Sequence, residues 1–282
     1  MSIPLKNSKP KQSAIPWIVL LVIALVCCRI CSGARRSREA PRPSPTARTA
    51  PVREVLPAPS PIEEMLKPPA NIGRKQGIAV AILMDTSGSM GDTVPDVSGK
   101  AVPKIEIARR AIKDLLARTE KFVTENPDRE LLLGVYEFSA IQGRPAARKV
   151  VPVGPPNLAA ALAAVDAMKP GGATPIGDAI IQAKRDLDAT GESHLHILVV
   201  TDGENNRGYN PNDVVGVISR MDAERRASVY FVAFDVAAGR FNGIRDQGGL
   251  VLSAKDGAEL QRTLDYVLTG KILAEQPVVP KQ

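Results

Sequence analysis

Five oxygen-bearing side chains in this sequence have the types and order of a divalent-metal site. Asp85, Ser87 and Ser89 are spaced by two residues, so an extended loop would point all three side chains to one side. Thr174 adds a third hydroxyl group and Asp202 adds a second carboxylate. An all-oxygen set suits a hard cation, so we expect Mg²⁺ first, with Mn²⁺ or Ca²⁺ as the alternatives.

The charges of these groups also indicate what such a metal would do. Two carboxylates balance a 2+ ion, and neutral hydroxyls add ligands without adding charge. If one carboxylate acts through a water molecule, the ion keeps positive character and an open coordination position. A Glu or Asp of a protein partner could fill that position. The residues are therefore compatible with a metal-mediated contact between proteins.

The elements around the five residues predict an α/β fold that brings them together. Gly77–Met84 and His194–Thr201 are continuous apolar runs, typical of strands buried on both faces, and each is followed by an aspartate. Further strands are expected over 131–138, 149–153, 228–234 and 250–253, and helices over 104–123, 157–168, 174–190, 210–226 and 256–272. This alternation predicts a doubly wound, mostly parallel, six-stranded Rossmann-like sheet flanked by helices. Ligands of such sheets bind at the carboxyl ends of the strands.

Each motif also has a simpler interpretation on its own. The Asp-x-Ser-x-Ser stretch could cap a helix, Thr174-Pro175 could be an ordinary N-cap with proline at N1, and Thr201-Asp202-Gly203 is a common turn. Their order along the chain, each at the edge of a strand or helix, favours one shared site.

Taken together, the motifs resemble the metal-ion-dependent adhesion site of von Willebrand factor type A (vWA) domains. The matching stretches are Asp85-x-Ser87-x-Ser89, Gly171-Gly172-Ala173-Thr174-Pro175-Ile176-Gly177 and Thr201-Asp202-Gly203. The resemblance covers residues 75–273. It implies direct coordination by Ser87 and Ser89, with Asp85, Thr174 and Asp202 bound directly or through water. It also implies a binding module rather than an enzyme, and in some members the last helix shifts when ligand binds. Gly91–Pro103 is longer than in compact members, so ligand specificity does not carry over.

Two other functions remain open on the sequence. Asp85 could be the nucleophile of a phosphoryl-transfer hydrolase, although Ser87 stands where a second carboxylate is often wanted. A serine nucleophile would need a base, and His194 and His196 are expected at the opposite end of the sheet. The third possibility is a structural, tethered domain whose metal site is vestigial.

The N-terminal quarter differs from the rest in charge. Residues 1–75 carry a net charge of +9 and residues 76–282 a net charge of −2, within the overall +7. The predicted domain therefore offers no basic surface for nucleic acid. A basic segment, 1–13, precedes an apolar segment, 14–31, that predicts a single-pass membrane anchor. A cleaved signal peptide and a buried helix are the alternatives, and the side of the membrane is open.

Proline dominates the segment that follows. Nine prolines lie between Pro41 and Pro69, and proline removes amide donors and favours extended backbone. We therefore expect residues 32–74 to be a disordered linker, residues 75–273 to form the vWA domain and residues 274–282 to be a tail. The whole chain is expected to be a membrane-tethered module that contacts an acidic residue of a protein partner.

Overall fold

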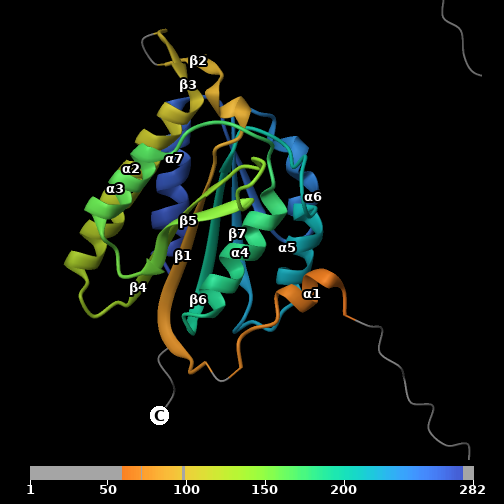
Figure 1. The fold of residues 1–282 in the computed structure, drawn as a ribbon. Helices are drawn as coiled ribbons and strands as arrows, with labels where there is room; N and C mark the ends of the chain where they lie inside the picture. The colour runs from red at the N-terminus through yellow and green to blue at the C-terminus, as the bar shows by residue number, and fades with distance from the viewer. Residues whose placement is uncertain (1–58, 71, 97–98, 276–282) are drawn as a thin grey trace, which may run out of the picture. The chain divides into compact units, whose positions relative to one another are not determined.

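The apolar runs of the sequence form the centre of a six-stranded sheet in the computed structural model, which describes residues 59–70, 72–96 and 99–275. The strands stand in the order β5-β4-β1-β6-β7-β8 (Figure 1). Their bounds are β1 Lys75–Asp85, β4 Leu131–Phe138, β5 Ala147–Gly154, β6 Glu192–Thr201, β7 Ala227–Phe234 and β8 Leu250–Ala254. Only the edge strand β5 pairs antiparallel with its neighbour, β4. The predicted α/β fold with a mostly parallel six-stranded sheet is confirmed.

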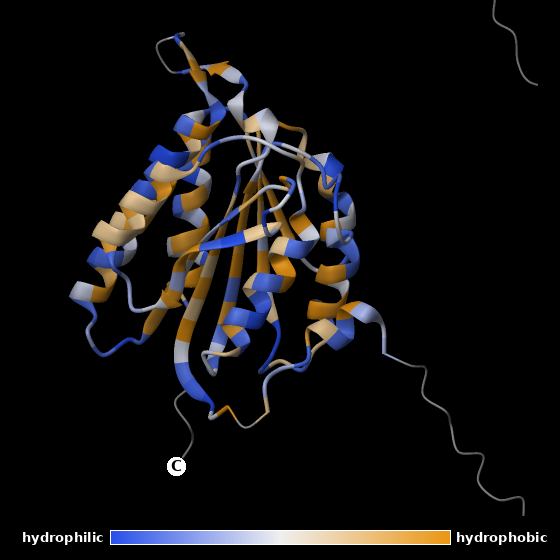
Figure 2. Cartoon of the chain, in the orientation of Figure 1, coloured by the Kyte–Doolittle hydropathy of each residue, from blue (hydrophilic) through white to orange (hydrophobic). Residues whose placement is uncertain are grey.

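Strand β1 shows why this sheet needs a helix layer on each face. All nine residues from Gly77 to Asp85 are buried. Since side chains alternate along a strand, Ile78 and Val80 pack into one apolar core, whereas Ala79 and Ala81 pack into the other. The strands between the two helix layers are mostly hydrophobic, whereas the helices carry both hydrophobic and hydrophilic residues (Figure 2).

The helices are divided between the two faces of the sheet (Figure 1). One face is covered by α2 (Lys104–Glu125), α3 (Leu158–Ala167) and α7 (Gly257–Val267), and the other by α1 (Pro61–Met65), α4 (Ile176–Asp188), α5 (Pro211–Ser219) and α6 (Asn242–Asp246). A π-helical turn, Leu268–Ile272, continues α7. Helix α5 ends at Ser219, earlier than the predicted residue 226. Helix α6 and a small hairpin of β2 (Thr93–Pro95) and β3 (Ala101–Pro103) were not predicted.

Helix α1 lies inside the segment predicted to be linker. Ser60 caps it, since its hydroxyl accepts from the Glu63 amide while the Glu63 carboxylate accepts from the Ser60 amide. Ile62 and Leu66 are buried in the core beside α4 and α5. The packed domain therefore begins about residue 60, and the prediction that the linker extends to residue 74 is corrected. Two apolar side chains four residues apart are enough to dock this turn.

Removing the Leu66 side chain tests whether α1 belongs to the domain. Leu66→Ala is expected to lower the free energy of unfolding of the full-length protein by about 2–4 kcal/mol, because the side chain is 1% exposed. Lys67→Ala is the matched control, since Lys67 is exposed and its ion pair with Glu64 lies at the surface. Chemical denaturation of both variants gives the comparison. Equal stabilities would mean that this helix does not pack on the domain.

The predicted N-terminal basic segment 1–13, the membrane segment 14–31, most of the linker and the tail beyond residue 275 lie outside the described residues. In the part of the chain that the structure describes, no helix is both long and apolar enough to span a bilayer.

Candidate functional site

The site lies where the strand order of the sheet reverses. Strands β1 and β6 are neighbours, and the strands that follow each of them in the chain are added outward in opposite directions. Asp85 is the last residue of β1, and Asp202 directly follows β6. Both aspartates therefore stand at the carboxyl ends of adjacent parallel strands, the position at which doubly wound sheets bind ligands.

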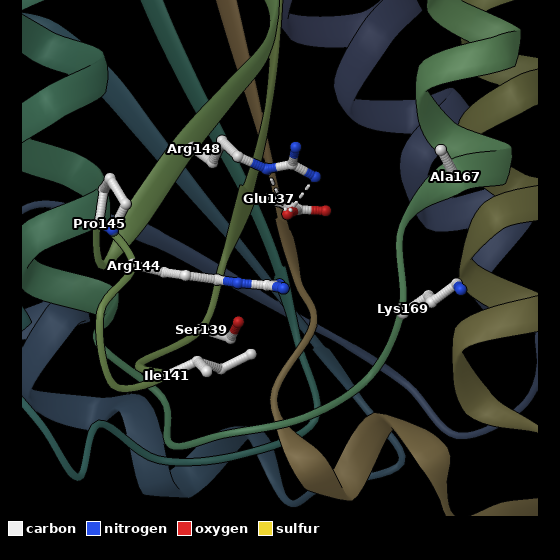
Figure 3. A pocket seen from close by; sticks show the side chains of 8 residues that line it. All are labelled: Glu137, Ser139, Ile141, Arg144, Pro145, Arg148, Ala167 and Lys169. Atoms are coloured by element: carbon white, nitrogen blue, oxygen red, sulfur yellow. Dashed lines mark hydrogen bonds and ion pairs between the residues drawn. The ribbon is translucent and has the colours of Figure 1, made fainter.

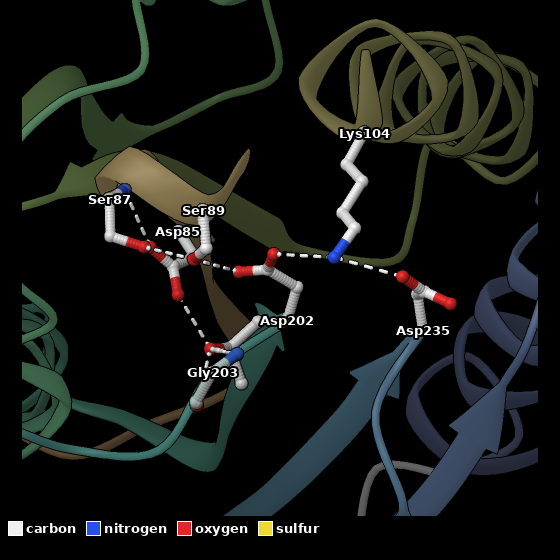
Figure 4. Close-up of polar contacts among 8 residues, drawn as sticks. Asp85, Ser87, Ser89, Lys104, Asp202, Gly203 and Asp235 are labelled. Carbon is white, nitrogen blue, oxygen red and sulfur yellow. Dashed lines mark hydrogen bonds and ion pairs between the residues drawn. The ribbon is translucent and has the colours of Figure 1, made fainter. Parts of the chain in front are cut away.

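Hydrogen bonds between side chains join three of the five predicted residues. Ser87 Oγ lies 3.2 Å from Ser89 Oγ, which donates to Asp202 Oδ1 at 2.8 Å (Figure 4). The prediction assumed an extended loop. Instead, Gly88–Gly91 forms a 3₁₀ turn with Ser87 at its N-cap. An N-cap side chain lies beside the first residues of its turn, so the two serine hydroxyls still meet.

Asp85 lies beneath these hydroxyls and is fully buried. Its Oδ1 accepts from the Ser87 amide at 2.7 Å, and its Oδ2 accepts from the Thr201 hydroxyl at 2.6 Å. Burial raises the pKa of Asp85 to about 6, against the opposing effect of these two hydrogen bonds. The fold therefore holds a carboxylate whose negative charge is incompletely compensated by the protein.

Thr174 approaches the same group from the loop before α4. A Cβ placed on Gly203 would lie 3.8 Å from both Thr174 Oγ1 and Ser89 Oγ, so both hydroxyls border Gly203. The sequence suggested that Thr174 caps the following helix. It does not cap α4, because the helix starts only at Ile176. Asn205 provides that cap instead: its Oδ1 accepts from the Ile176 amide at 2.8 Å. The Thr174 hydroxyl is thus left to the site.

Gly172 fixes the path of the Thr174 loop. Its φ is +85°, and its carbonyl accepts from the Gly88 amide at 2.9 Å, which ties this loop to the serine loop. A Cβ at this position would lie 2.6 Å from the carbonyl oxygen of Ala140. Backbone atoms cannot move aside as a flexible side chain can, so the close approach requires glycine.

Adding one methyl group at Gly172 is expected to disturb this loop. Gly172→Ala should lower the free energy of unfolding by about 2 kcal/mol more than Gly99→Ala. Gly99 is the matched control because its φ is +79°, yet nothing lies within 4 Å of a Cβ there. Denaturation midpoints of the two variants provide the measurement. Similar losses in both would contradict the close contact with Ala140.

Two further charged residues belong to the site and were not predicted. Lys104, at the start of α2, places its Nζ 3.1 Å from Asp202 Oδ2 and 2.9 Å from Asp235 Oδ2 (Figure 4). Although burial lowers the pKa of the Lys104 ammonium, the bonds to Asp235 and Asp202 raise it above its usual range. Asp235 follows β7 and has a φ of 53°, the one positive value at a non-glycine residue in the described ranges. A signal for Asp235 existed in the sequence, since it directly follows an apolar run of residues as Asp85 and Asp202 do.

The two histidines lie far from these residues along β6, as predicted. His194 Nδ1 lies 2.7 Å from Glu275 Oε2, and His196 Nε2 lies 3.3 Å from the same oxygen. Burial raises the pKa of the Glu275 carboxyl, but the two histidines lower it further, so that it lies below its usual range. Both histidines lie in the amino-terminal half of β6, and both side chains contact Glu275, the last described residue.

The chemistry of the converging groups fits a hard divalent cation. Three hydroxyls and two carboxylates provide oxygen donors only, the kind that Mg²⁺, Mn²⁺ and Ca²⁺ prefer. Within the described residues, no three His, Cys, Asp or Glu side chains form a group that could hold a metal ion. A metal at this rim would therefore depend on the serine and threonine hydroxyls as well as on the aspartates.

A family comparison covers the same stretch of chain. Residues 80–204 match the family model of the von Willebrand factor type A domain. The chain contains a vWA domain. The matched stretch runs from β1 past the end of β6, so it includes all five predicted residues. None of the curated proteins compared with the chain matches it.

Solved structures share the vWA fold with this chain at low sequence identity. The conserved hypothetical protein BatB from Bacteroides thetaiotaomicron is 18% identical, with a TM-score of 0.51 over 69% of this chain and 98% of that one. A von Willebrand factor type A protein from Catenulispora acidiphila is 21% identical, with a TM-score of 0.53 over 71% of this chain and 43% of its own. The pilus adhesin SpaC from Lactobacillus rhamnosus GG is 15% identical, with a TM-score of 0.52 over 73% and 31%. The chain thus spans less than half of the last two.

Proposed function

We propose that this vWA domain binds a divalent metal ion and, through it, a carboxylate of a protein partner. The ligands are Asp85, Ser87, Ser89, Thr174 and Asp202, and Mg²⁺ is the metal that their donor set favours most. The observation that carries the proposal is the hydrogen-bonded series of Ser87, Ser89 and Asp202 above the buried Asp85.

Charge explains why the partner would be acidic. The two aspartates neutralise a 2+ ion, but Lys104 already compensates part of the Asp202 charge. Asp235 pairs with the same ammonium, so the charges at this rim sum to zero once an ion is bound, and no excess negative charge repels an incoming carboxylate. When bound, Mg²⁺ would supply a positive coordination position that accepts an external carboxylate oxygen. Hydroxyl ligands keep that position electrophilic, since they bring no charge of their own.

The remaining side chains support binding rather than catalysis. A serine nucleophile would need an adjacent base that is free to take its proton, but the Asp202 carboxylate beside Ser89 is paired with Lys104, and the Lys104 ammonium is itself held by Asp202 and Asp235. His194 and His196 are held by Glu275 at the other half of β6. The shared fold of the pilus adhesin SpaC is compatible with an interaction module.

A membrane tether completes the proposal. The apolar segment within 14–31 would anchor the chain, and the proline-rich stretch up to about residue 59 would separate the anchor from the domain. Retention of the full-length protein in the membrane fraction after an alkaline carbonate wash supports the anchor. Release of the full-length protein by the wash would contradict it.

A peptide with a single carboxylate tests the metal-mediated contact. The probe is a Gly/Ser peptide with one Glu, a trifluoroacetylated amino terminus and an amidated carboxyl terminus, observed by fluorine NMR. The full-length protein is expected to bind it in Mg²⁺, and EDTA or Asp85→Asn is expected to abolish binding. The matched peptide with Gln should not bind. Binding that is unchanged by EDTA would contradict a metal-mediated contact.

A further inference from the structure

A basic pocket borders the metal-site loops on the side of β4 and β5. It is lined by Glu137, Ser139, Ile141, Arg144, Pro145, Arg148, Ala167 and Lys169, and encloses about 490 Å³ that is partly open to solvent. Its residues come from the β4–β5 hairpin, from the last residue of α3 and from the segment after it (Figure 3). None of them belongs to the five predicted ligands.

The pocket carries an excess of positive charge. Glu137 Oε1 accepts from Arg148 Nε at 2.7 Å and lies 2.6 Å from Arg148 Nη2, so these two charges compensate each other. Arg144 extends its guanidinium into the pocket, and Lys169 lines the opposite wall (Figure 3). Both are exposed, and neither side chain has a hydrogen bond or ion pair to any residue in the described ranges. Two cations and the Ser139 hydroxyl are thus free to receive an anion.

The pocket is joined directly to the loop that carries Thr174. The Ala140 amide donates to the Ala173 carbonyl at 2.8 Å, and the Ala173 amide donates back at 3.2 Å. A Cβ on Gly172 would lie 2.8 Å from Ile141 Cγ1, so the pocket wall touches the loop two residues before Thr174. A short peptide segment can therefore reach the pocket while one of its carboxylates is at the metal site.

We infer that this pocket binds a second carboxylate of the same acidic partner, with Arg144 as its main ligand and Lys169 and Ser139 beside it. The inference rests on the proposed metal-mediated contact and adds that the partner presents paired acidic residues. A guanidinium binds a carboxylate through two parallel N–H···O bonds. Glu137 Oε2 is buried in the same pocket without a hydrogen-bond partner. Its negative charge repels a phosphate dianion more strongly than a carboxylate, which carries a single negative charge.

Peptides with two glutamates test the inference. The probes are the single-Glu peptide described above and a series with a second Glu placed one to four Ser or Gly residues away. In Mg²⁺, the full-length protein is expected to bind the best two-Glu peptide about tenfold more tightly than the single-Glu peptide. Arg144→Glu combined with Lys169→Glu should remove this gain and leave the affinity for the single-Glu peptide within about twofold.

Arg262→Glu is the matched control, since Arg262 is an exposed arginine on α7, outside the pocket. It should keep the tenfold gain. No gain at any spacing, a gain that survives the double charge reversal, or a gain only with phosphoserine in place of the second Glu would overturn the inference and leave the metal-mediated contact intact. Loss of Mg²⁺-dependent binding of the single-Glu peptide would instead overturn the proposed function, and this inference with it.

Discussion

Asp85→Asn is expected to make the metal-free protein more stable at about pH 7.5, by on the order of 2–3 kcal/mol. The Asp85 carboxylate is buried, and its pKa of about 6 lies above the ordinary value of 3.8. The folded protein therefore binds this proton more tightly than the unfolded chain does. Stability falls as the pH rises from about 4 to about 6, and the full penalty is present above that range.

Asparagine can keep the local hydrogen bonds while it removes the charge. Its amide oxygen can accept from the Ser87 amide as Oδ1 of Asp85 does. The Thr201 hydroxyl, which now donates to Asp85 Oδ2, also lies 3.0 Å from the Gly203 carbonyl and can donate to it instead. The asparagine Nδ2 then donates to the Thr201 hydroxyl oxygen.

Urea denaturation in EDTA measures how the Asp85→Asn substitution changes the stability of the metal-free protein. Urea denaturation in Mg²⁺ measures how it changes the stabilisation by metal. In EDTA, the variant should exceed the wild type at about pH 7.5 and lose its advantage near pH 4. In Mg²⁺, the wild type should gain stability with metal concentration, and the variant should not. A less stable variant at pH 7.5 in EDTA, or equal stabilisation of both proteins by Mg²⁺, would show that Asp85 is not a poised ligand.

Lys104→Met is expected to have the opposite effect on the metal-free protein. The Lys104 ammonium is 11% exposed and compensates Asp202, whose side chain is 0% exposed, together with Asp235. Removing it leaves buried negative charge unpaired, which should lower the free energy of unfolding by about 3 kcal/mol in EDTA. The same loss of positive charge should tighten Mg²⁺ binding about tenfold.

Lys113→Met on the same helix is the control for this variant. Lys113 pairs with Asp166 at 2.6 Å, but its side chain is 31% exposed and that of Asp166 57%, so its loss should cost less than about 1 kcal/mol and leave Mg²⁺ affinity unchanged. Calorimetric Mg²⁺ titrations and urea denaturation provide the two measurements. If the two methionine variants behave alike, Lys104 is an ordinary surface charge and not a counter-ion of the site.

The strands and the five oxygen-bearing residues could be predicted because their signals are local. The apolar run of β1 requires burial on both faces, and the parallel arrangement then places Asp85 and Asp202 at one rim. Nothing beyond strand order is needed to bring these two together. The coordination of a metal by the five residues remains a prediction, because coordination is a property of the loaded site.

The features that the sequence did not predict depend on contacts between distant parts of the chain, or on a local helix signal that lies among residues typical of a linker. Lys104 reaches Asp202 only because the β2–β3 hairpin returns the chain to the rim before α2 begins. Asn205 replaces Thr174 as the cap of α4 through a contact between loops nearly thirty residues apart. Helix α1 had a local signal, the capping box from Ser60 to Glu63, but the surrounding prolines favoured an extended linker.

A manganese titration of the full-length protein, followed by electron paramagnetic resonance of the free ion, tests the central claim most directly. Mn²⁺ accepts the same oxygen ligands as Mg²⁺, and its spectrum in solution disappears when it binds protein. We predict that the wild type binds one equivalent that excess Mg²⁺ displaces, and that Asp85→Asn binds none. Mn²⁺ that stays free with the wild type, or that binds both proteins equally, would contradict a metal site built from Asp85, Ser87, Ser89, Thr174 and Asp202.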